Sequence, residues 1–76
     1  MTARKLSALQ PLRIIRALEG CGLVIKRQTG GHVIMTKPGL FRPVVIARHS
    51  RELPPGTIGD ILTQAEVSVE DFLDHI

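Results

Sequence analysis

Two short β-prone runs separated by a Gly-Gly step constrain this chain more than any other feature. The runs span residues 23–28 and 32–36, with Thr29, Gly30 and Gly31 between them. Glycine adopts backbone conformations that other residues avoid, so the pair allows a tight turn with positive φ. It also leaves the backbone bare, so that a ligand can approach closely. The sequence therefore predicts an antiparallel hairpin, with His32 as the first residue after its turn.

Further short elements on both sides of the hairpin complete an α+β pattern. Apolar spacing predicts a helix over residues 11–19, and Val44 to Ala47 follow Pro43 as a third strand. A second helix carries an apolar stripe from Ile58 to Ala65, and Ser68 is placed to cap a third helix that runs from Val69 to the end. The 76 residues predict a single domain, 1–76, in the order α-β-β-β-α-α. We expect a three-stranded antiparallel sheet with helices on one face.

Strand alternation assigns the side chains of the hairpin to two faces. In the first strand it predicts Leu23, Ile25 and Arg27 on one face, opposite Val24, Lys26 and Gln28. In the second strand it predicts Val33 and Met35 on one face, opposite His32, Ile34 and Thr36. Alternation does not say which face a ligand uses, because a slip of one residue exchanges the faces.

The charges are distributed very unevenly along the chain. The first 51 residues contain all ten Lys and Arg with one acidic residue, a balance of +9, whereas the last 25 contain six acidic residues and no cation. A basic body of this density indicates a phosphate-bearing partner, and the competing interpretation is a solvated surface of mixed sign. With no Trp, no Tyr and two Phe, the chain does not fit a sheet that stacks bases on aromatic residues.

The remaining reactive residue types exclude several classes of site. Cys21 is a single cysteine without a partner, and we interpret it as a small buried residue at a helix end. Three scattered histidines lack the spacing of a zinc site, so we expect neither metal nor cofactor. The N-terminal residues carry no apolar run of the length of a signal peptide or membrane span, and we expect a cytoplasmic protein without membrane contact.

An ordered set of short motifs resembles the HicA-type (YcfA-like) toxins. The motifs that carry the resemblance, in chain order, are Arg16-Ala17-Leu18-Glu19, Gly22-Leu23, Arg27-Gln28, Gly30-Gly31-His32, His49, Glu52-Leu53, Gly56-Thr57, Ile61-Leu62, Gln64-Ala65 and Ser68-Val69-Glu70-Asp71-Phe72. Each is weak alone, but the set at these spacings is specific and covers the chain from Pro11 onward. The resemblance implies a fold similar to the double-stranded-RNA-binding domain.

The resemblance also implies a function. Proteins of this family are toxins of type II toxin–antitoxin pairs that cut mRNA without a metal, and a HicB-like antitoxin silences them. His32 occupies the position of the family's catalytic histidine. It would act as general base toward the 2′-hydroxyl or as general acid toward the leaving oxygen. For RNA binding we name Lys26, Arg27, Gly30, Gly31, Arg48 and His49.

Three positions depart from the family pattern. Val33 stands where many members have a second histidine, Gly59 and Asp60 stand where a basic residue is common, and Glu66 replaces a glycine that would cap the second helix. Two interpretations of His49 stay open. It is either a loop residue that bonds to backbone or a residue that contacts phosphate. For the whole chain we keep two alternatives to the toxin: a non-catalytic RNA-binding module and a protein-binding domain whose surface is the acidic C-terminal third.

Overall fold

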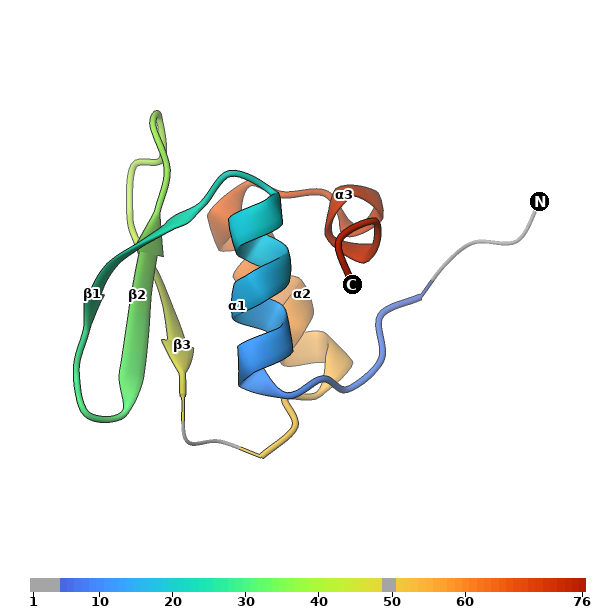
Figure 1. Ribbon diagram of the computed structural model, residues 1–76. Coiled ribbons are helices and arrows are strands. Elements are labelled where there is room, and N and C mark those ends of the chain that lie inside the picture. Colours follow the sequence, from blue (N-terminus) through green and yellow to red (C-terminus); the bar gives the residue numbers. More distant parts are fainter. Residues whose placement is uncertain (1–4, 49–50) are drawn as a thin grey trace.

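A layer of helices lies on one side of a three-stranded antiparallel sheet in the computed structural model, which describes residues 5–48 and 51–76 (Figure 1). The elements are α1 (Pro11–Gly20), β1 (Val24–Gln28), β2 (His32–Thr36), β3 (Val44–Ala47), α2 (Pro55–Ala65) and α3 (Val69–Leu73). The strand order is β1-β2-β3, as expected for a meander. The predicted α+β class and the order α-β-β-β-α-α are confirmed.

Two helices end in the same way with different residues. After α1, Gly22 takes a φ of 100°, its N–H donates to Glu19 O at 3.0 Å, and Leu23 N–H donates to Leu18 O at 3.0 Å. After α2, Glu66 takes the left-handed position with a φ of 56°, and Val67 N–H donates to Leu62 O at 3.0 Å. A residue with a Cβ costs about 1 kcal/mol there relative to glycine. Helix α2 therefore ends where a glycine would have ended it.

The other helix ends agree only in part with the ends that the sequence predicts. Asp71 N–H donates to Ser68 Oγ at 3.1 Å, so Ser68 caps α3 as predicted. Gln10 precedes Pro11 at the start of α1 and makes no side-chain cap bond. Helix α3 ends at Leu73, several residues before the predicted end at the C-terminus. It packs on α1 and α2, farther from the sheet than either of them (Figure 1).

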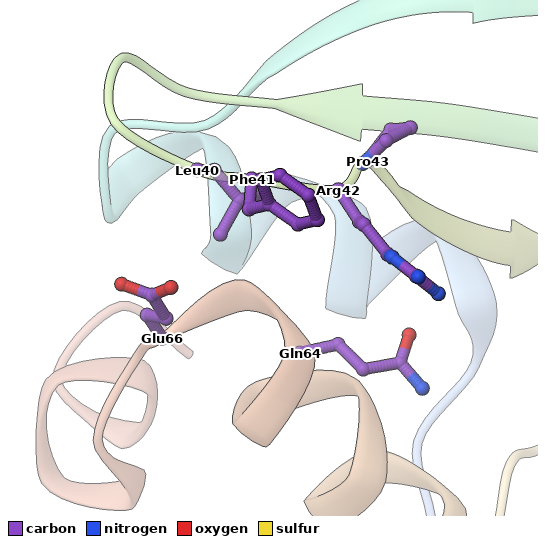
Figure 2. Close-up of a pocket in the computed structure, with 6 residues that line it drawn as sticks. All are labelled: Leu40, Phe41, Arg42, Pro43, Gln64 and Glu66. Carbon is purple, nitrogen blue, oxygen red and sulfur yellow. The ribbon is translucent and has the colours of Figure 1, made fainter.

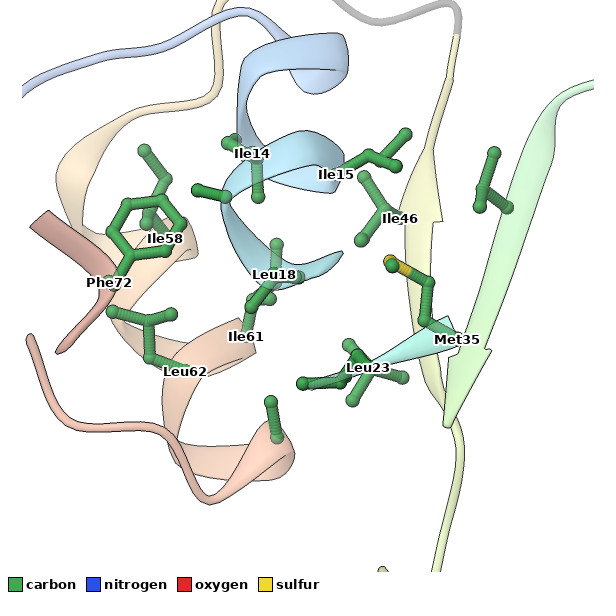
Figure 3. Close-up of a cluster of buried hydrophobic side chains, with 14 of the residues drawn as sticks. Ile14, Ile15, Leu18, Leu23, Met35, Ile46, Ile58, Ile61, Leu62 and Phe72 are labelled. Carbon is green, nitrogen blue, oxygen red and sulfur yellow. The ribbon is translucent and has the colours of Figure 1, made fainter. Parts of the chain in front are cut away.

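The core fills the space between the helices and the inner face of β2 and β3. Figure 3 shows Ile14 and Leu18 of α1 between Phe72 on one side and Ile46 and Met35 of the sheet on the other. Every residue of β1 is exposed, so this strand is held mainly by its pairing with β2. The helices thus cover one face of the sheet and leave the other face open.

A β-bulge in β1 changes the faces that alternation predicts. Val24 and Ile25 pair with Thr36 and Met35, but the next residue in register with β2 is Arg27, opposite Ile34. Lys26 is the extra residue, so every later side chain of β1 changes sides. The prediction that Arg27 shares a face with Ile25 is wrong, as is the grouping of Gln28 with Val24. Alternation along the chain does not reveal a bulge, because it assumes an unbroken ladder.

Candidate active site on the open face of the sheet

The turn between β1 and β2 is tight and accessible. Thr29 N–H donates to His32 O at 2.9 Å and closes the hairpin around Gly30 and Gly31. A Cβ added at Gly30 would meet no atom within 4 Å, so another molecule has room to approach this side of the turn. The turn does not use the positive φ that two glycines allow. Among the described glycines that conformation occurs at Gly22 and Gly39.

His32 is the first residue of β2 and lies on the open face. The next residue, Val33, is buried against the helices, so alternation turns the imidazole away from the core. Its cross-strand partner is Ala47 of β3, whose methyl group leaves space beside the ring. The side chain is exposed. His32 is therefore free to contact a ligand on this face.

The bulge brings two cations to the same face as His32. Arg27 pairs with Ile34, two residues along β2 from His32, so the two side chains are diagonal neighbours about 7 Å apart at the backbone. Lys26 and Arg27 line a hollow of about 370 Å³. Its other lining residues are Ile34, Pro43 and Val45. His32 shares the open face with these cations but does not line their hollow. An imidazole and two cations on one open face are suited to bind a phosphodiester and to move a proton at it.

Arg48 reaches the turn through its backbone but directs its charge elsewhere. Its N–H donates to Gly31 O at 2.8 Å, so it lies directly beside the Gly-Gly step. Its guanidinium donates to Gln28 Oε1 at 3.0 Å and lines a second hollow with Leu12 and Ile15 of α1. This hollow of about 280 Å³ lies on the helix side of the sheet. The structure therefore does not bring the Arg48 charge together with His32.

Other predicted and unpredicted residues complete the site. His49 lies outside the described residues. Ile34, Pro43 and Val45, which form the apolar floor beside the cations, were not among the predicted site residues. The alternation of β2 already indicated that Ile34 faces outward. No comparable signal marked Pro43, because its place in the hollow depends on how the loop after β2 folds back.

Cys21 is not part of this site. It caps the C-terminal end of α1, half-buried, with its Sγ 3.6 Å from His75 Nδ1. Burial raises the pKa of the Cys21 thiol above its usual value, and the Asp71 carboxylate raises it further. A raised pKa leaves the sulfur protonated at neutral pH, which agrees with a packing role.

Two negative findings concern the described residues. Within residues 5–48 and 51–76, no three His, Cys, Asp or Glu side chains gather in a way that could hold a metal ion. None of the helices in this part of the chain is long and apolar enough to cross a membrane.

Comparison with known proteins identifies the family. A search of curated proteins gives no match. A family model described as the HicA toxin of bacterial toxin–antitoxin systems matches residues 13–67. The matched segment contains β1, β2 and β3, the Gly-Gly-His turn and all of α2. Because it covers well over half of the chain, the chain belongs to the HicA toxin family and is the toxin partner of a cognate antitoxin.

Proposed function

We propose that this toxin is an endoribonuclease that cuts mRNA on the open face of the sheet, with His32 as its catalytic residue and a HicB-like antitoxin as its inhibitor. The observation that carries the proposal is the joint placement of His32, Arg27 and Lys26 on one uncovered face. A single imidazole with adjacent cations is the minimum needed for proton transfer at a phosphodiester. The described residues of this face form an open surface with a hollow of about 370 Å³, which suits a polymer that lies across it.

The reaction uses the substrate's own nucleophile. The 2′-oxygen of a ribose attacks the adjacent phosphorus while the 5′-oxygen of the next nucleotide leaves. The products are a 2′,3′-cyclic phosphate and a free 5′-hydroxyl. His32 either takes the proton from the 2′-hydroxyl or gives one to the leaving oxygen. Lys26 and Arg27 stabilise the extra negative charge on the phosphorus oxygens as the bond order changes. The Gly30-Gly31 step keeps side chains out of the path of the strand.

The experiment that tests the proposal varies the substrate and leaves the protein intact. The purified toxin is incubated with a single-stranded RNA and with the same strand carrying one 2′-deoxyribose at the mapped cut site. We expect cleavage of the first, with cyclic phosphate ends visible by mass spectrometry, and no cleavage at the modified position, because its nucleophile is missing. Cleavage at the deoxyribose would contradict the mechanism. Binding of both strands without cleavage of either would favour the non-catalytic RNA-binding module.

A paired charge substitution tests the role of the two cations. We expect Lys26→Gln with Arg27→Gln to raise the Kd for single-stranded RNA at least tenfold at low salt. The slope of log affinity against log salt should become shallower by about 1.4, because each lost phosphate contact on a single strand removes about 0.7. Filter binding over a salt series measures both quantities.

Two cations on α1 supply the matched control for that experiment. Arg13 and Arg16 are also exposed but belong to the helix layer, away from the open face. Replacing both with Gln removes the same charge and should leave the salt slope close to that of the wild-type protein. Equal slopes for the two double variants would show that binding follows net charge and not this face.

A further inference from the structure

The loop between β2 and β3 carries the most exposed aromatic side chain of the protein. Phe41 is 87% exposed, and its ring contacts the guanidinium of Arg42, whose Cζ lies 5.8 Å from the ring centroid. An exposed Phe pays a solvation cost in the free protein that a partner would remove. The chain has only two Phe residues, and the other, Phe72, is fully buried.

The loop holds Phe41 in a defined position. Lys37 to Leu40 form a turn with Pro38 and with Gly39 at a φ of 85°, closed by Leu40 N–H donating to Lys37 O at 3.1 Å. Leu40 packs against the core, and Lys37 Nζ donates to Glu66 O at 3.2 Å, which ties the loop to the end of α2. Phe41 is therefore presented by a pre-organised loop, which lowers the entropy cost of binding through it.

A hollow opens beside this aromatic residue, between the loop and the C-terminal end of α2 (Figure 2). It has a volume of about 500 Å³ and is lined by Leu40, Phe41, Arg42, Pro43, Gln64 and Glu66. Apolar, basic, acidic and amide groups thus meet around one cavity. Pro43 also lines the hollow of Lys26 and Arg27 on the open face, so the two surfaces are continuous at this residue.

We propose that Phe41 is the anchor through which the cognate antitoxin holds this toxin. Phe and Arg are both enriched in protein interfaces relative to the rest of the surface, and Arg is among the residues most frequent at their energetic centres. The fitting partner surface offers an apolar pocket for the ring and a carboxylate for Arg42, which also suits the basic charge of the toxin. A nucleic acid fits less well, because the Glu66 carboxylate lines the same hollow and repels phosphate.

The position of the anchor has a functional consequence. Strand β2 begins at His32 and leads to the 37–40 turn, so Phe41 lies at the opposite end of the sheet from His32. The antitoxin therefore has a binding determinant outside the proposed catalytic residues. Substitution of Phe41 should separate neutralisation from toxicity. The binding measurement depends only on membership of the toxin family, whereas the cleavage readout rests on the proposed function.

The test measures binding of the purified cognate antitoxin by calorimetry. We expect Phe41→Ala to raise the Kd about 30-fold, the loss typical of a central interface residue, and Arg42→Ala to raise it less. Leu12→Ala is the matched control, because Leu12 is 57% exposed on α1 and belongs to neither hollow beside Phe41. Cleavage of RNA by the free Phe41→Ala toxin should equal that of the wild-type protein.

A fluorescent variant shows directly whether the antitoxin buries the side chain at position 41. The chain contains no Trp, so Phe41→Trp introduces a single indole whose emission should shift to shorter wavelength when the antitoxin binds, with affinity retained. Three results would overturn the proposal. The first is a Kd of Phe41→Ala for the antitoxin within twofold of the wild-type value. The second is loss of RNA cleavage by Phe41→Ala with its antitoxin affinity unchanged. The third is a blue shift of Phe41→Trp that depends on toxin concentration alone, which would assign the ring to a homodimer.

Discussion

We expect His32→Ala to lower the rate of RNA cleavage by about 10² to 10⁴, the usual contribution of a positioned acid or base. The substitution removes the imidazole and should leave the fold intact, because the side chain is exposed and is not part of the buried core. The backbone of His32 still closes the turn by accepting from Thr29 N–H. Single-turnover cleavage of a labelled RNA, with circular dichroism of both proteins, measures the effect.

A second variant separates proton transfer from simple contact. His32→Gln keeps a hydrogen-bonding group of similar size but cannot exchange a proton near neutral pH, so it should be as inactive as His32→Ala while binding RNA like the wild-type protein. In cells, induction of the wild-type toxin should stop growth and degrade mRNA, and neither variant should do so. Activity of His32→Ala within threefold of wild type would place the chemistry on another residue.

A modified substrate decides which proton His32 moves. Replacing the bridging 5′-oxygen with sulfur supplies a leaving group that departs as a thiolate and needs no acid. If His32 is the general acid, this substrate should restore most of the rate lost in His32→Ala. If His32 is the general base, the variant should stay equally impaired on both substrates. His32 performs one of the two proton transfers, and this substrate identifies which one.

The second large effect concerns stability and comes from α3. We expect Phe72→Ala to lower the free energy of unfolding by about 3 to 5 kcal/mol, because Phe72 is fully buried and its removal leaves a cavity. The ring lies beside Ile58 and Leu62 of α2 (Figure 3) and connects α3 to the other two helices. Such a loss is a large fraction of a typical stability of about 5 to 15 kcal/mol.

Chemical denaturation with a local control measures this effect. The midpoint in urea should fall for Phe72→Ala with the slope unchanged, and the melting temperature should drop by more than about 12 °C. Val69 lies on the same helix but is 36% exposed, whereas Phe72 is fully buried, so Val69→Ala should change stability much less, by about 1 kcal/mol. A loss below 1 kcal/mol for Phe72→Ala would mean that α3, which lies outside the matched segment 13–67, contributes little to the fold.

Local signals in the sequence determined most of the elements. Pro11 and Ser68 marked the starts of α1 and α3, because their backbone and side-chain chemistry acts within one turn. The Gly-Gly step located the hairpin, and the alternation of Val33 and Met35 was enough to place His32 on the opposite face. The family motifs then directed attention to His32, whose catalytic role remains a prediction.

Only the tertiary structure decided which side chains share a face with His32. Arg27 reaches the open face because the pairing of β1 with β2 inserts Lys26 as an extra residue, and no local pattern encodes that choice. The Arg48 charge lies on the helix side, where Gln28, turned inward by the same bulge, accepts its hydrogen bond. The exposure of Phe41 depends on a loop held by Leu40 and Glu66, which are distant in sequence. Local sequence encodes turns and periodicity, whereas these placements depend on contacts between segments that only the folded chain brings together.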